Sequence, residues 1–211
     1  MQNHWNLGRW LGIPVTMDWT VLLAFAWLFL MLGELLAALV GAVAFGCLLA
    51  AHEFGHVAMA RWRRVPVYGI NFNGLHGETA RGHAARRGDE ILVAWGGVLA
   101  QLLILVLALA ASQALAFSTN SWVSRIAGPW LMVWTRWNVF LIIVALLPIG
   151  PMDGHAAWKV IPFLREKLRR RPQPKPASTG KVVELDAARR RALEAESAKA
   201  ADEIINRLKK K

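Results

Sequence analysis

Long runs of apolar residues, separated by short polar segments, dominate the first 150 positions of the chain. Four runs stand out, and they cover roughly residues 17–32, 35–60, 91–117 and 123–147. A helix needs about 20 apolar residues to cross a bilayer, and each run supplies about that number, the first only barely. The pattern therefore predicts a mainly α-helical, polytopic membrane protein with about four transmembrane helices.

The segment Met1 to Leu32 also has the outline of a signal peptide, with Arg9 ahead of an apolar stretch. No convincing small-residue cleavage site follows, and Glu34 leads directly into the next apolar run. We therefore expect a retained first helix. The short connection Gly33-Glu34 indicates that this helix and the second one form an antiparallel pair.

The periodicity changes between residues 65 and 81, after the second apolar run. Strand-forming residues are frequent from Val67 to Phe72, and Asn73-Gly74 is typical of a tight hairpin turn. We therefore predict a small β-hairpin between the second and third helices. The alternative is an irregular basic loop held by glycines.

The character of the sequence changes again after residue 164. Residues 169–176 are basic and rich in proline, which is typical of a solvated linker, and Val183 to Leu208 contains many good helix formers. We predict a membrane-embedded core, residues 1–164, followed by a basic linker and a cytoplasmic helical tail, residues 165–211. The tail helix is expected to be solvated, to lie on the anionic inner leaflet, or to pair with a partner.

Composition supports the membrane class. Of the 211 residues, 55% are apolar and only 18% are charged, and the mean hydropathy is +0.35. A soluble domain of this size does not need so large an apolar share. The single cysteine, Cys47, excludes an internal disulfide and is expected to be a small core residue.

The formal net charge of +11 raises nucleic acid as a partner, but no segment resembles a base-reading module. Sixteen of the 25 Lys and Arg residues follow His155, and six more lie from Arg61 to Arg87. This distribution follows the positive-inside rule. We therefore expect a multi-pass protein of a bacterial or archaeal cell membrane, in contact with the lipid bilayer and not with nucleic acid, and with both termini cytoplasmic.

The second apolar run contains His52-Glu53-Phe54-Gly55-His56, an H-E-x-x-H signature. Residues four apart lie on one face of a helix, so both imidazole rings can bind one metal ion. Glu53 is placed to take a proton from a water molecule that the metal activates. An ionisable cluster inside an apolar helix is costly unless something binds it. The motif therefore predicts a metal centre at membrane depth.

Zinc in a hydrolase usually keeps three protein ligands and one open position, so a third ligand must come from elsewhere in the chain. Asp153 is the strongest candidate because it lies within Leu147 to Gly154, where two prolines and two glycines break the fourth helix. The other candidates are His76, Glu78, His83 and His155. Of these, Glu78 and His83 are expected at the surface.

These signatures together resemble the site-2 protease family, the intramembrane zinc metalloproteases. The first family signature, H-E-x-x-H, is present at His52 to His56, and the second, an Asp-Gly after a proline-rich helix break, is present at Pro148 to Gly154. The opening Leu7 to Val15 is similar to the amphipathic segment that leads into the family's first helix. The resemblance covers about residues 7–155.

The resemblance implies one Zn²⁺ ion per chain, bound by His52, His56 and Asp153, with Glu53 as the catalytic carboxylate. It implies an intramembrane metalloendopeptidase that cuts transmembrane protein substrates in or near their membrane segments, in regulated intramembrane proteolysis. We expect the exposed edge of the Val67 to Phe72 hairpin to hold an unwound substrate as an added strand. The alternatives are an inactive zinc-binding scaffold and a metal transporter.

The chain departs from the family pattern in two places. Gly97 to Gln101 replaces a Gly-Pro-x-x-Asn element, with Val for Pro and Gln for Asn, and Ala145 to Pro148 replaces Asn-Leu-Leu-Pro. If the missing amides support the substrate or an oxyanion, Gln101 and Asn138 are the candidates to take over that role. The alternative role for both residues is a hydrogen bond between helices.

Overall fold

The structure is a computed structural model that describes residues 4–74, 76–117, 120–150, 152–169 and 180–209. It forms two compact units, one up to Arg165 and one from Glu166 onward. Most of the segment predicted to be a proline-rich linker lies outside the described residues, as does Pro151 of the predicted helix break.

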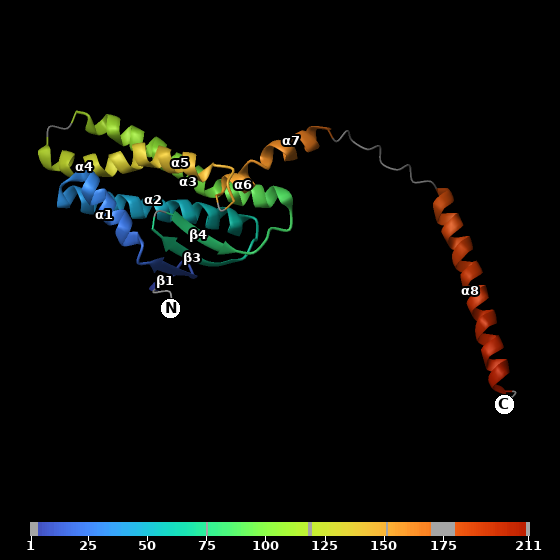
Figure 1. Cartoon of the computed structure of the whole chain (residues 1–211). Coiled ribbons are helices and arrows are strands. Elements are labelled where there is room, and N and C mark those ends of the chain that lie inside the picture. The colour runs from blue at the N-terminus through green and yellow to red at the C-terminus, as the bar shows by residue number, and fades with distance from the viewer. Residues whose placement is uncertain (1–3, 75, 118–119, 151, 170–179, 210–211) are drawn as a thin grey trace. The chain divides into compact units, whose positions relative to one another are not determined.

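Helices make up most of the chain (Figure 1). The first unit contains α1 (Val21–Leu32), α2 (Leu35–Trp62), α3 (Arg87–Leu115), α4 (Ser121–Met132), a π-helical turn η1 (Val133–Trp137), α5 (Asn138–Ala145) and α6 (Gly154–Ala157). Helix α7 (Val160–Arg169) follows, and α8 (Gly180–Lys209) covers the segment for which the sequence predicted a tail helix.

Three helical segments are long and apolar enough to cross a membrane, and they are Leu35–Trp62, Arg87–Leu115 and Ser121–Ala145. The first of the four predicted spans is not confirmed, because α1 has only 12 residues. At ~1.5 Å per residue it is about 18 Å long, well short of the ~30 Å hydrocarbon core. The predicted start near Met17 was wrong because that residue belongs to a β-strand.

The outward faces of these helices are apolar, as expected for surfaces in contact with lipid. Large exposed hydrophobic residues include Leu39, Val43, Leu103 and Val106. Cys47 of α2 is also exposed, so the expectation of a core residue was wrong. An apolar run in a membrane protein does not distinguish the lipid-facing side of a helix from its packed side.

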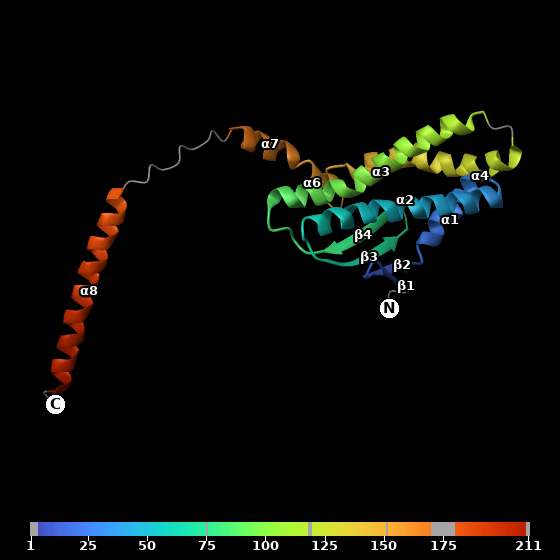
Figure 2. The same cartoon turned by 180° about the vertical axis from the view of Figure 1, so that it is seen from behind.

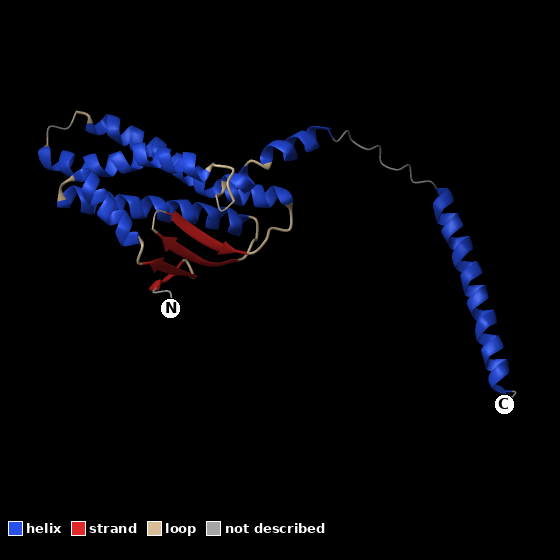
Figure 3. Ribbon diagram, viewed as in Figure 1, coloured by secondary structure: helices blue, strands red, loops and turns tan. Residues whose placement is uncertain are grey.

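Four strands form one small sheet in the order β1-β2-β3-β4 (Figure 3). They are β1 (His4–Trp10), β2 (Ile13–Asp18), β3 (Val67–Asn73) and β4 (His76–Arg81). The predicted hairpin is confirmed as the antiparallel pair β3–β4. β3 pairs with β2 on its other side, so β4 is an edge strand of the sheet.

The segment that the resemblance described as an amphipathic entry to the first helix, residues 7–15, belongs to the strand pair β1–β2, which directly precedes α1. The turn between the two strands has positive φ at Leu11 (50°) and Gly12 (81°), a combination that suits a tight hairpin. Ile13 and Val15 are buried and alternate with more exposed neighbours. This period-two alternation was the sequence signal for a strand.

β2 and β3 are parallel, and α1 and α2 form the crossover between them. The crossover returns the chain to the sheet, so the sheet lies along the second half of α2 (Figure 2). Leu48 of α2 packs in one buried cluster with Val15 and Ile70 of the sheet. The fold therefore places β-strands next to the H-E-x-x-H segment.

Helices α2 and α3 approach each other most closely through two glycines. A Cβ atom on Gly55 would lie 2.3 Å from the Gly96 carbonyl oxygen, and one on Gly96 would lie 2.5 Å from the Gly55 carbonyl oxygen. Small residues allow such backbone contact between membrane helices. Because Gly55 is inside the motif, this contact fixes α3 beside the two histidines.

Candidate metal centre

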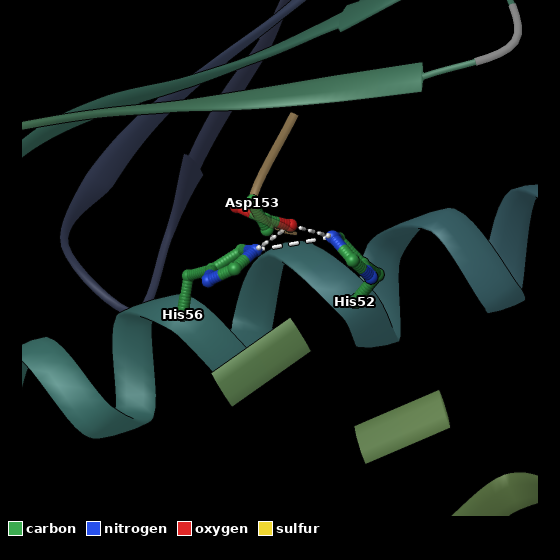
Figure 4. Close-up of side chains that lie close together, drawn as sticks. All are labelled: His52, His56 and Asp153. Carbon is green, nitrogen blue, oxygen red and sulfur yellow. Dashed lines mark hydrogen bonds and ion pairs between the residues drawn. The ribbon is translucent and has the colours of Figure 1, made fainter. Parts of the chain in front are cut away.

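His52, His56 and Asp153 converge on one point, although the aspartate is about a hundred positions away in sequence (Figure 4). The two histidine Nε2 atoms are 3.0 Å apart, and Asp153 Oδ2 lies 3.0 Å from His52 Nε2 and 3.1 Å from His56 Nε2. His56 is buried, whereas His52 and Asp153 are half-buried. The structure thus brings together the three ligands that the resemblance implied.

Each histidine is held through its other ring nitrogen. His56 Nδ1 lies 2.7 Å from the Val93 carbonyl oxygen, and His52 Nδ1 lies 3.0 Å from Gln101 Oε1. Carbonyl oxygens only accept hydrogen bonds, so both Nδ1 atoms donate, and in the neutral rings both Nε2 atoms carry lone pairs. Such outer contacts are the ones that orient histidine ligands of metals.

The three converging atoms therefore form a set of acceptors with no proton to share. Two imidazole lone pairs and a carboxylate oxygen repel one another at about 3 Å unless a cation lies among them. Tetrahedral zinc with bonds of ~2.0–2.1 Å keeps its ligand atoms roughly 3.3 Å apart, close to the observed spacing. The nitrogen and oxygen donors and their spacing fit zinc.

Asp153 reaches the histidines because the chain turns sharply after α5. A Cβ atom on Gly154 would lie 2.3 Å from the Leu146 carbonyl oxygen, so only glycine permits this close return of the backbone. The turn therefore brings Asp153 Oδ2 to the Nε2 atoms of both histidines.

Glu53 is almost completely buried beside the histidines, with 2% of its surface exposed. The Thr79 hydroxyl of β4 donates a hydrogen bond of 2.5 Å to Glu53 Oε2. The carboxylate also lies directly over Gly77, where a Cβ atom would be 2.5 Å from Oε1. β4 therefore orients the carboxylate that α2 supplies.

A cavity of about 500 Å³ opens over these groups. Its walls come from α2, β4, α3, α5 and the turn that carries Asp153, and they include His52, Glu53, His56, His76, Glu78, Thr79, Arg81, Gln101, Ala145 and Asp153. His76 and Glu78 line the cavity but lie outside the cluster of three ligands. His83 and His155 are not among its lining residues.

Gln101 and Asn138 both lie deep in the bundle, at 2% and 0% exposure. Gln101 lines the cavity and contacts His52 as described above. Asn138 Nδ2 donates to the backbone carbonyls of Gln101 (2.9 Å) and Trp134 (3.2 Å). The amide N–H groups of Asn138 thus make a hydrogen bond between helices, and they are directed at backbone rather than at the cavity.

Among solved structures, a similar fold occurs in a protein described as Site-2 Protease from Methanocaldococcus jannaschii. The similarity has a TM-score of 0.56 and 22% sequence identity, and it covers 78% of this chain and 73% of that chain. The chain has a site-2 protease-like fold. No family model and no curated protein matches the sequence. The resemblance that the motifs indicated is thus confirmed at the level of fold.

Within the site-2 protease-like fold, two residues lie at the site that were not predicted from the sequence. Thr79 holds Glu53, and its alternation with exposed neighbours in β4 was a weak signal that it faces the helices. Gly97 lies against both ligands, since a Cβ atom there would be 2.6 Å from the Nε2 atoms of His52 and His56. Its position depends on how α3 packs, so no local pattern reveals it.

Proposed function

We propose that the protein is an intramembrane zinc metalloprotease that hydrolyses peptide bonds in or near the transmembrane segments of its substrates. The observation that carries the proposal is the convergence of His52 Nε2, His56 Nε2 and Asp153 Oδ2 next to the buried carboxylate of Glu53. A metal transporter has no need of a carboxylate oriented beside the ligands. The fold and the three long apolar segments also support the proposal.

A zinc ion bound by His52, His56 and Asp153 would acidify a water molecule and polarise the scissile carbonyl group. Glu53 accepts a proton from the attacking water and later delivers it to the nitrogen of the departing amine. Thr79 occupies Oε2 of this carboxylate, which leaves Oε1 for the transfer.

The substrate is a membrane helix that must unwind before its carbonyl groups become accessible. We assign this step to the exposed edge of the β3–β4 hairpin, as expected from the sequence. β3 pairs on both sides, so the free edge of the hairpin is β4, and Gly77 and Thr79 of β4 line the cavity. An unwound substrate added along His76–Arg81 would therefore pass directly over Glu53 and the metal ligands.

The path of the chain supports an orientation in which the metal centre lies near the cytoplasmic side of the membrane. The crossover through α1 and α2 brings the N-terminal strands and β3–β4 to one end of the helices, and the turn with Asp153 lies at the same end. The basic segment from Arg61 to Arg87 belongs to this end. The positive-inside rule makes it cytoplasmic, so substrates would be cut near the inner face.

The decisive experiment compares the wild type with Glu53→Gln and Asp153→Asn after reconstitution into vesicles with a single-span model substrate. The wild type should bind one zinc ion per chain and cleave. Glu53→Gln should keep the zinc and lose cleavage by about a thousandfold or more, because the proton acceptor is removed. Asp153→Asn should lose both. Stoichiometric zinc without cleavage by the wild type would indicate a zinc-binding scaffold.

A further inference from the structure

The third long apolar segment, Ser121–Ala145, carries two arginines with different surroundings. Arg125, in the first turns of the segment, forms an ion pair with Glu34 and lies over the Trp122 ring. Arg136, in the π-helical turn, has no hydrogen-bond or ion-pair partner within the described part of the chain. A charge inside an apolar segment is costly, and such residues usually have a functional role.

Arg136 projects into a groove of about 960 Å³ between α1 and the segment η1–α5. The groove is mainly apolar, with walls that include Leu23, Trp27, Met31, Phe45 and Met132. Arg136 is the one charged side chain among its described lining residues, and it is exposed. The groove therefore offers an apolar surface with a single cation that lacks a counter-ion.

The groove shares part of its wall with the cavity at the metal centre. Phe140 and Leu141 of α5 line both the groove and the cavity above the ligands. Trp134 Nε1 donates a 2.9 Å hydrogen bond to the Ala44 carbonyl oxygen, so the turn that carries Arg136 is anchored on α2. Arg136 thus has a defined position relative to the site of reaction.

We propose that Arg136 is a specificity-determining residue that binds a carboxylate of the substrate segment. The proposal rests on the proposed protease function. An apolar segment fits the walls of the groove, and a side-chain or terminal carboxylate supplies the counter-ion that Arg136 lacks. An arginine–carboxylate pair removed from water is strong and directional.

The helix geometry also fixes the position of this carboxylate. Arg136, Phe140 and Val144 follow one another at four-residue intervals; Arg136 and Phe140 line the groove, and Phe140 and Val144 line the metal cavity. Eight residues of helix span about 12 Å, and an extended substrate covers that distance in about four residues. Allowing for the reach of the arginine side chain, the carboxylate lies about three to six residues from the cleaved bond.

The test measures binding and cleavage separately. Binding uses the Glu53→Gln protein in neutral phosphatidylcholine vesicles and membrane peptides that carry a single Glu, Gln or Lys at successive positions. The Glu peptide should bind about tenfold or more tightly than the Gln peptide at positions within the stated window. Arg136→Gln should abolish this preference, Arg136→Lys should keep part of it, and Arg136→Glu should transfer it to the Lys peptide.

The control variant carries Glu34→Gln together with Arg125→Gln, which removes the other arginine of the segment with its partner. This variant should keep the full preference for the Glu peptide. Equal binding of the Glu and Gln peptides by the Arg136-intact protein would overturn the proposal. So would an effect of Arg136→Gln that is the same for both peptides, or one that appears only with anionic lipid, since these outcomes point to packing or to a lipid phosphate.

Cleavage by the Glu53-intact protein separates the two proposals. If the Glu53-intact protein cuts the Glu peptide faster than the Gln peptide, and Arg136→Gln removes this preference, both proposals are supported. If it binds with the expected preference but cuts no peptide, the protease proposal fails while the assignment of Arg136 survives. If it cuts all peptides equally, the protease stands and the assignment fails.

Discussion

Gln101 Oε1 accepts a hydrogen bond of 3.0 Å from His52 Nδ1, and this contact joins α3 to the H-E-x-x-H helix at the metal centre. It leaves the Nε2 lone pair of His52 directed at His56 and Asp153. A glutamine at a position where the family pattern has Asn therefore has a clear structural task. It orients a candidate metal ligand.

Replacement of Gln101 tests that task. Gln101→Leu removes the acceptor for the His52 ring, so the zinc affinity should fall by about 10–100-fold. Gln101→Glu keeps an acceptor and should retain affinity near that of the parent. Titration against a competing chelator measures the zinc affinity of both variants. Unchanged zinc affinity in Gln101→Leu would show that His52 needs no such support.

Gly97 should be intolerant of any side chain. A Cβ atom there would lie 2.6 Å from the Nε2 atoms of both histidines, so Gly97→Ala should lower the zinc content by about a hundredfold or more at limiting metal. Gly46→Ala is the matched control, because a Cβ atom at Gly46 meets nothing within 4 Å. Elemental analysis of purified protein provides the measurement. Full zinc content in Gly97→Ala would contradict the geometry of the site.

Replacement of Thr79 should change the rate of cleavage and leave zinc binding unchanged. Thr79→Val keeps the shape of the side chain but removes the hydroxyl that donates to Glu53 Oε2. A hydrogen bond to a charged group contributes about 1.5–3 kcal/mol, so cleavage should slow by about 10–100-fold with zinc retained. Thr79→Ser should restore most of the rate. A loss of zinc in Thr79→Val would instead indicate a structural role.

The free edge of β4 should be required for cleavage of the substrate and should not be required for zinc binding. Proline at Glu78 or at Ala80, which are exposed residues of β4, adds a ring and removes an N–H from the strand. If substrate pairs with this edge, these variants should cut a membrane substrate at least about tenfold more slowly while binding zinc normally. Tyr68→Ala, on the inner strand β3, is the control. Normal cleavage by both proline variants would exclude strand addition.

The close contact of α2 and α3 predicts a stability effect. Gly55→Ala would place a methyl group 2.3 Å from the Gly96 carbonyl oxygen, so the helices must separate. Overpacking of this kind typically costs about 1–3 kcal/mol of the free energy of unfolding. Unfolding in detergent titrations should show the loss, whereas Gly46→Ala should show none. An equal stability of the two variants would mean that the helices adjust freely.

Local pattern in the sequence determined the long apolar helices, the β3–β4 hairpin and the ligands His52 and His56. Periodicity, turn residues and four-residue spacing depend only on neighbouring positions, so a single chain reveals them. Asp153 was also predicted, because its helix-breaking neighbours showed that the backbone turns there. The short α1 and the β1–β2 pair were missed because an apolar run hid the strand alternation of Ile13 and Val15.

Tertiary structure alone decided which groups act together. The crossover through α1 and α2 pairs β3 with β2, so β4 is the strand of the hairpin with a free edge, and the Thr79 hydroxyl of β4 lies on Glu53. The packing of α3 against Gly55 placed Gly97 and Gln101 at the histidines. These contacts join residues tens of positions apart, and their geometry depends on how whole helices pack. Sequence thus determined the candidate ligands, and the fold decided which residues orient them and which strand edge is open for the proposed substrate.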